Sequence, residues 1–229
     1  MLPSRPRHNV PAEDLDAHID TQPASATARL TLKRLGMAPY EDTWRAMQSF
    51  TASRTAETPD ELWLVQHPPV YTLGVAGRLE HLPHERQDIP VVRTDRGGQI
   101  TYHGPGQIVA YVLLDMRRRH LTIRPLVRKL ETAVIDLLDD YGTTAAGRPE
   151  APGVYVGDAK IAALGLRVTR GCCYHGLALN VDMDLSPFNE IDPCGYPGLA
   201  VTQLRDLGVL DSIETVGEKL ALKLAKVLA

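Results

Sequence analysis

A cysteine and a lysine in the second half of the chain have the surroundings of catalytic groups. Cys194 lies in the stretch DPCGYPG, whose prolines and glycines predict a rigid loop that exposes the thiol to solvent. Lys160 lies in GDAKIAALGLR, whose apolar residues predict partial burial, and burial favours the neutral amine that a base requires. A cysteine attacks as its thiolate, which a nearby cation stabilises. From the residues alone this pair is one candidate among many, because most lysines are solvated surface charges.

A glycine-rich stretch, RGGQITYHGPGQ at residues 96–107, is the third candidate feature. Its glycines let a ligand approach the main chain closely, and Arg96 and His103 supply polar side chains. We predict an active-site loop here, with a turn-rich hairpin of no function as the alternative. For His103 we favour a positioning role over proton transfer, which Lys160 already provides, and a purely structural hydrogen bond is the alternative.

Other thiol and polar residues are interpreted as structural. Cys172 and Cys173 begin an expected strand and are predicted to be small buried hydrophobes, with a second reactive thiol as the alternative. The three arginines at 117–119 could receive an acidic carrier protein, but such a run is usually a solvated face. Asn180 and Asp182 are expected to end a strand and are predicted to form a turn, with a catalytic role as the alternative.

Composition limits the possible classes of protein. The chain has 229 residues, 44% hydrophobic content, a formal net charge of -3 and a pI near 6.2, which argue for one enlarged domain and against a general nucleic-acid binder. We expect no membrane association, because no apolar run approaches about 18 residues. Three cysteines and no secretory leader fit a reducing compartment, so we expect a cytoplasmic protein. Residues 1–27 lack a sustained period and are predicted to be a flexible N-terminal extension.

The hydrophobic pattern predicts an α/β protein of the α+β type, with a mixed, largely antiparallel sheet and flanking helices. Gly36 is expected to end the first strand, and Pro39 to precede a helix. The expected strands cover residues 30–35, 61–66, 70–74, 90–94, 108–114, 154–156, 160–168 and 173–181, and the later helices cover residues 124–141 and 215–228.

Three motifs in one order carry a family resemblance. RGGQITYHGPGQ, then VGDAKIAALGLR, then CCYHGLALNVDMDLSPFNEIDPCGYPG closely resemble the lipoyl(octanoyl) transferase family, and the resemblance runs from about Leu30 to the C-terminus. It implies the catalytic-domain fold of the biotin and lipoate protein ligases. It also implies that residues 28–229 form a single octanoyltransferase catalytic domain.

The resemblance further implies a reaction and its residues. Cys194 would take an octanoyl group from octanoyl-acyl carrier protein as a thioester, and Lys160 would act as the acid/base. The acceptors would be lysine amines on lipoyl domains of 2-oxoacid dehydrogenase complexes and on the glycine cleavage H protein, with no cofactor, metal, nucleic acid or membrane involved. The residues that would contact the substrate are Arg96, Gly97, Gly98, Gln99, Ile100, Thr101, Tyr102, His103, Ala163, Leu164, Gly165, Gly176, Leu177 and Ala178.

Three alternatives belong to other classes of protein. The related ligases activate a free acid with ATP and need no nucleophilic cysteine, so DPCGYPG and HGPGQ favour transfer, as does the absence of a GxxxxGK[ST] phosphate loop. A cysteine hydrolase would pair a cysteine with His103 or His175 and release the free acid. A non-catalytic acyl-binding protein would retain its ligand without Cys194.

Overall fold

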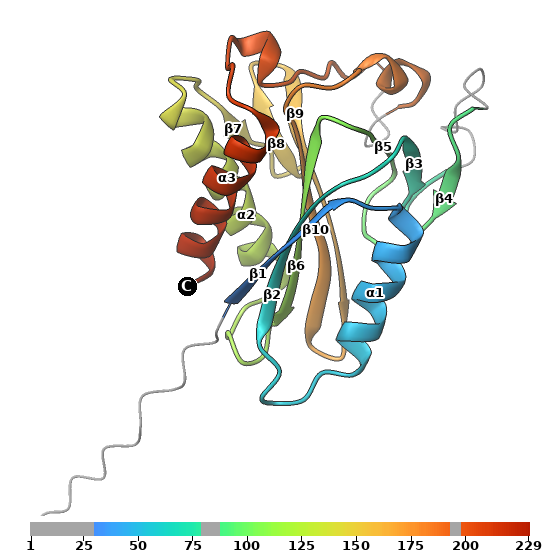
Figure 1. The fold of residues 1–229 in the computed structure, drawn as a ribbon, viewed down its shortest axis with the longest axis vertical. Coiled ribbons are helices and arrows are strands. Elements are labelled where there is room, and N and C mark those ends of the chain that lie inside the picture. The colour runs from blue at the N-terminus through green and yellow to red at the C-terminus, as the bar shows by residue number, and fades with distance from the viewer. Residues whose placement is uncertain (1–29, 79–87, 193–197) are drawn as a thin grey trace, which may run out of the picture.

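A seven-stranded mixed sheet forms the centre of the fold in the computed structural model, which describes residues 30–78, 88–192 and 198–229 (Figure 1). Strands β1 and β2 pair in parallel and the other neighbours are antiparallel, which confirms the predicted mixed, largely antiparallel sheet. In spatial order the strands are β1 (Leu30–Met37), β2 (Asp60–Gln66), β6 (Gln107–Asp115), β10 (Cys172–Asn180), β9 (Ala159–Thr169), β8 (Gly153–Val156) and β7 (Ala146–Gly147).

Helices cover both faces of this sheet. Helix α1 (Tyr40–Ala52) packs on one face, where Met47 meets Trp63 of β2 and Tyr174 of β10. Helices α2 (Ile123–Asp140) and α3 (Ile213–Leu228) lie side by side on the other face, as Figure 1 shows. Their apolar stripes are buried there in the larger core, as the helical spacing predicted. The Ser212 hydroxyl caps α3 by accepting a hydrogen bond from the Thr215 amide at 3.3 Å.

A second, three-stranded sheet lies beside α1 and corrects the prediction of one long loop at residues 96–107 (Figure 1). Its order is β4 (Val91–Arg93), β3 (Val70–Leu73) and β5 (Ile100–His103), and β5 pairs antiparallel with β3. Ile100 and Tyr102 are both buried, so the middle of the glycine-rich stretch behaves as a strand with alternating side chains. Short 3-10 helices cover Ser186–Glu190 and Arg205–Leu207.

Two further expectations are corrected near the N-terminal edge and at the arginine run. Gly36 does not end β1, because the strand continues to Met37 across a register shift with Gly36 at φ 65°. The run at 117–119 is not simply a solvated face. Arg118 and Arg119 both contact the fully buried carboxylate of Asp60, which Arg54 also contacts.

The predicted N-terminal extension at residues 1–27 and the proposed nucleophile Cys194 lie outside the described residues. The assignment of residues 28–229 to one catalytic domain therefore stays a prediction. Within the described ranges, no helix combines the length and the apolar character needed to cross a membrane.

Candidate active site

The side chain of Lys160 is buried near the start of β9, with the residue only 3% exposed. Its side-chain nitrogen donates to the carbonyl oxygen of Pro152 at 3.1 Å and lies 5.2 Å from the ring centroid of Tyr155. Gly153 provides the space for this side chain, since a Cβ atom at position 153 would lie 2.3 Å from Cε of Lys160. Burial of the amine is more complete than the sequence predicted.

Residues 200–202 run alongside the backbone of Lys160. The Lys160 amide donates to the Ala200 carbonyl at 2.8 Å, and the Thr202 amide donates to the Lys160 carbonyl at 3.0 Å. Val201 forms a parallel bridge with Lys160 between these two bonds. Cys194 shortly precedes this segment in the sequence, but the contact between Cys194 and Lys160 stays a prediction because Cys194 lies outside the described residues.

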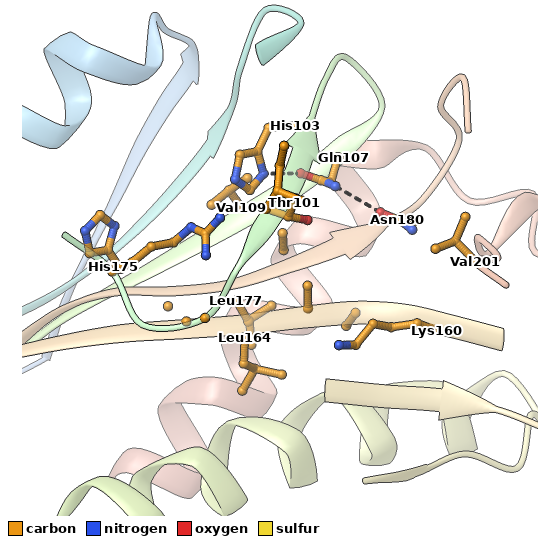
Figure 2. A pocket seen from close by; sticks show the side chains of 18 of the residues that line it. Thr101, His103, Gln107, Val109, Lys160, Leu164, His175, Leu177, Asn180 and Val201 are labelled. Atoms are coloured by element: carbon orange, nitrogen blue, oxygen red, sulfur yellow. Dashed lines mark hydrogen bonds between the residues drawn. The ribbon is translucent and has the colours of Figure 1, made fainter. Parts of the chain in front are cut away.

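A pocket with an empty volume of about 740 Å³, part of it open to solvent, extends away from Lys160 between the two sheets (Figure 2). Backbone and side chains of β5, β6, β9 and β10 line it, and apolar residues such as Leu164 and Leu177 contribute to its wall. Lys160 and His175 lie at opposite ends of this pocket in Figure 2. That placement agrees with the strand register, because His175 pairs with Leu166, which lies further along β9 than Lys160 near the start of that strand.

The structure brings most of the expected substrate-contacting residues to this one pocket. Those that line it are Arg96, Gly98, Gln99, Ile100, Thr101, His103, Ala163, Leu164, Gly165, Gly176, Leu177 and Ala178. Gly97 and Tyr102 are not among its described lining residues. The Gly97 amide bonds to the Leu166 carbonyl at 2.9 Å, and the Tyr102 ring packs between Tyr71 and Phe188.

Two of the lining glycines are required by close packing of the main chain. A Cβ atom at Gly176 would lie 2.0 Å from the carbonyl oxygen of Ala110 on the neighbouring strand β6. A Cβ atom at Gly165 would lie 2.8 Å from the carbonyl oxygen of Gly97, where the chain crosses over β9. The small size of Gly176 therefore lets β10 lie close to β6, and that of Gly165 lets the main chain at Gly97 cross β9 beside the pocket.

Polar groups on the opposite wall are buried and hydrogen-bonded. Arg96 donates to the Thr72 hydroxyl at 2.8 Å and to the Gly97 carbonyl at 3.0 Å. His103 contacts Gln107 Oε1 through Nδ1 at 2.7 Å and the Thr72 hydroxyl through Nε2 at 3.3 Å. Burial, reinforced by the nearby charge of His67, lowers the pKa of His103 to about 3. His103 is therefore neutral at neutral pH, and both ring nitrogens already have partners.

The sequence analysis missed Asp95, which lies against His175 at the far end of the pocket, and it considered His175 only as the possible partner of a cysteine in a hydrolase. His175 adopts φ 65°, rare for a residue with a side chain, and its Nε2 lies 2.9 Å from Asp95 Oδ1. Burial alone would raise the pKa of Asp95, but hydrogen bonds from His175 and Tyr174, and from Gln48 and Trp44 of α1, together lower it. Burial lowers the pKa of His175 despite Asp95.

Asn180 and the two adjacent cysteines also differ in part from expectation. Asn180 is the last residue of β10, which confirms that it ends a strand, but it lines the pocket and does not belong to a turn. Cys173 is buried, as predicted, and burial raises the pKa of its thiol to about 12. Cys172 is only partly buried, and burial raises its thiol pKa as well. Among the described residues, no cluster of histidine, cysteine, aspartate and glutamate could hold a metal ion.

The sequence pattern of this site matches a known family over most of the chain. The family model for the lipoyl protein ligase A/B catalytic domain matches residues 39–225. This chain belongs to that family. A relative named octanoyltransferase from Nitrosospira multiformis is 65% identical over 195 residues, which is 85% of this chain and 90% of the relative. An octanoyltransferase from Azoarcus sp. strain BH72 is 60% identical over 205 residues, 90% of each chain.

Solved structures of a putative lipoate protein ligase and of a biotin protein ligase share the fold. A putative lipoate protein ligase from T. acidophilum with bound lipoic acid superposes with a TM-score of 0.69 at 20% identity, covering 88% of this chain and 86% of that one. Biotin protein ligase from Aquifex aeolicus superposes with a TM-score of 0.52 at 11% identity, covering 87% and 68% of the two chains. These likenesses confirm the predicted biotin/lipoate ligase catalytic-domain fold and, at such identities, show the fold alone.

Proposed function

We propose that this enzyme transfers an octanoyl group from octanoyl-acyl carrier protein to a lysine amine on a lipoyl domain. The observation that carries the proposal is the buried Lys160 amine at one end of an apolar pocket, in a chain whose relatives at 59–65% identity are named octanoyltransferase. β9 extends about 16 Å between Lys160 and Gly165, enough for an extended octanoyl chain. Burying each methylene of that chain contributes about 0.8 kcal/mol.

In the proposed first step, the Cys194 thiolate attacks the carbonyl carbon of the donor thioester. The bond from that carbon to the carrier sulfur breaks, a new thioester forms on Cys194, and the carrier thiol leaves with a proton. Lys160 accepts the proton of the Cys194 thiol and returns it to the leaving sulfur. The acyl chain would be held by the residues that line the pocket, which come from the stretch between Arg96 and His103 and from β9 and β10.

In the second step the acceptor amine attacks the carbonyl carbon of the Cys194 thioester, the amide bond forms as the bond from that carbon to the Cys194 sulfur breaks, and the sulfur receives the proton that the amine loses. The lysine amine of the acceptor must lose a proton, for which neutral Lys160 is the proposed base. Conversion of a thioester to an amide is downhill, so the reaction needs no ATP. We assign the acceptors to lipoyl domains of 2-oxoacid dehydrogenase complexes and the glycine cleavage H protein, and we place the reaction in the cytoplasm.

A comparison of acyl donors tests this proposal against the ligase alternative. The protein is mixed with an apo lipoyl domain and either octanoyl-acyl carrier protein alone or octanoate with ATP, and acceptor mass is followed with time. The proposal predicts octanoylation with the carrier thioester and none with octanoate and ATP. Modification only with octanoate and ATP would place the chain with the acid-activating ligases. Release of free octanoate without acceptor modification would favour the hydrolase alternative.

A further inference from the structure

Four buried side chains connect Arg96 at one side of the pocket to the segment that runs beside Lys160. They are Thr72, His103, Gln107 and Asn180, each no more than 6% exposed. Figure 2 shows the middle of this row, in which His103, Gln107 and Asn180 are joined by two hydrogen bonds. None of these four residues is the proposed nucleophile or the proposed base. The presence of four polar side chains in the protein interior therefore needs another explanation.

The direction of these hydrogen bonds is fixed at the Arg96 end. A guanidinium can only donate, so the Thr72 hydroxyl oxygen accepts from Arg96 at 2.8 and 3.2 Å. The hydroxyl hydrogen of Thr72 is then directed to Nε2 of His103 at 3.3 Å. Nε2 must therefore carry a lone pair, and in a neutral imidazole the proton lies on Nδ1.

The far end fixes the same direction independently. Main-chain carbonyls can only accept, so Asn180 Nδ2 donates to the Thr202 carbonyl at 3.0 Å, and Gln107 Nε2 donates to the Tyr102 carbonyl at 3.2 Å. Gln107 Nε2 also donates to Asn180 Oδ1 at 3.0 Å. Gln107 Oε1 is then the acceptor for Nδ1–H of His103 at 2.7 Å. Both ends require His103 to be the Nδ1–H tautomer.

This series of hydrogen bonds ends at residues 200–202 and helps to fix the position of that segment. Asn180 holds this segment through its side chain, which donates to the Thr202 carbonyl, and its own carbonyl accepts from the amide of Leu204, two residues further along the chain, at 3.2 Å. The same segment bonds to the Lys160 backbone on both sides of Val201. A change at Asn180 would therefore be transmitted to the main chain that flanks the Lys160 side chain.

We propose that Thr72, His103, Gln107 and Asn180 are positioning residues, whose one-directional hydrogen bonds from Arg96 to Thr202 hold residues 200–202 in register with Lys160. This role rests on the proposed acyl transfer, in which Lys160 is the acid/base. It also makes His103 a fixed neutral link, because each nitrogen already has its partner. Such a chain gains strength as a unit, since each bond polarises the next.

The tautomer of His103 tests the hydrogen-bond chain without any assay of activity. The imidazole nitrogens are observed by ¹⁵N NMR in the full-length protein and assigned by their loss in His103→Asn. We expect protonated Nδ1 and a hydrogen-bonded lone pair on Nε2. In Thr72→Val the Nε2 signal should shift to that of a free lone pair, and Thr72→Ser should restore it. A proton on Nε2, or an unchanged Nε2 signal in Thr72→Val, would contradict the proposed direction of the hydrogen bonds from Arg96 to Thr202.

The kinetics of Asn180→Asp test the positioning role. This substitution keeps the oxygen that accepts from Gln107 and removes the donor to the Thr202 carbonyl. We expect kcat for octanoyl transfer to fall roughly tenfold to a hundredfold with KM for the acyl donor nearly unchanged, because misplacement by about 1 Å has an effect of that size. An unchanged kcat, or a rise in KM alone, would contradict positioning.

If Asn180→Asp fails to fold, a comparison of Thr72→Val with Thr72→Ser gives the same kinetic test at the Arg96 end of the series of hydrogen bonds. Loss of kcat in the valine variant and its return with serine are expected, and equal kcat in both would overturn the proposal. If the wild-type protein transfers no octanoyl group, the proposed function fails, while the His103 spectrum still decides the hydrogen-bond chain.

Discussion

Replacing Gly153 by alanine should displace the Lys160 amine, and the hairpin of β8 and β9 contains its own control. The added Cβ would lie 2.3 Å from Cε and 3.0 Å from Nζ of Lys160. Ordinary contact begins near 3.4 Å, so Cε must retreat by about 1 Å (3.4 minus 2.3 Å). A displacement of about 1 Å at a catalytic group can lower the rate about a hundredfold, and we predict a loss of this order for acylation of Cys194.

Gly157→Ala is the matched control in the same hairpin. Gly157 also has a positive φ, 57° against 152° at Gly153, but a Cβ there has nothing within 4 Å. Both variants carry backbone strain, which is greater at φ 152°, where the added Cβ would also lie 2.8 Å from the Ala162 carbonyl oxygen, and only Gly153→Ala reaches Lys160. Both are mixed with octanoyl-acyl carrier protein in single-turnover reactions, and thermal melting confirms that they are folded. Equal acylation rates in the two folded variants would refute the placement of Lys160 as the acid/base.

Three further predictions concern stability and thiol reactivity. Asp60→Ala leaves three guanidinium groups around a buried position without their carboxylate, so urea unfolding should show a loss of about 3–5 kcal/mol, and a loss below 1 kcal/mol would contradict this pairing. Burial lowers the pKa of His67 to about 4 and that of His103 to about 3, so the unfolded chain binds protons first as pH falls below about 6.5. Unfolding free energy should therefore fall from pH 7 to pH 5 by about 2 kcal/mol per histidine, and His103→Asn should reduce that slope; an equal slope in the variant would show that His103 is not buried as a neutral group. Iodoacetamide at pH 8 should leave Cys173 unmodified in the folded protein, because burial raises its thiol pKa to about 12, and peptide mapping that finds Cys173 alkylated before unfolding would contradict its burial.

Local patterns in the sequence were sufficient to predict most of the larger elements. Leu126, Leu130 and Val134 recur at helical spacing, and all three are buried on the inner face of α2. The closely spaced apolar runs of β8, β9 and β10 predicted antiparallel neighbours, and the structure confirms that pairing. Strand β5 was missed because it is short, lies between glycines and depends on pairing with the distant strand β3.

The parts of the site that were missed depend on contacts between residues far apart in the sequence. Asp95 receives hydrogen bonds from Trp44 and Gln48 of α1 and from His175 of β10, and no local pattern links these positions. Arg118 was interpreted as a surface charge because its partner Asp60 lies in β2, 58 residues earlier in the sequence. Motifs can place Lys160 and His103 near a substrate, but only the packed structure shows which polar groups already have partners.

The mass of the intact protein after mixing with octanoyl-acyl carrier protein, without acceptor, tests the central claim most directly. Cys194→Ala removes the proposed nucleophile, and Cys172→Ala removes a partly buried thiol outside the pocket as a control. The account predicts one octanoyl adduct on the wild type and on Cys172→Ala, none on Cys194→Ala, and transfer of that adduct to an added lipoyl domain without ATP. An adduct that persists in Cys194→Ala, or acceptor octanoylation by that variant at the wild-type rate, would contradict it.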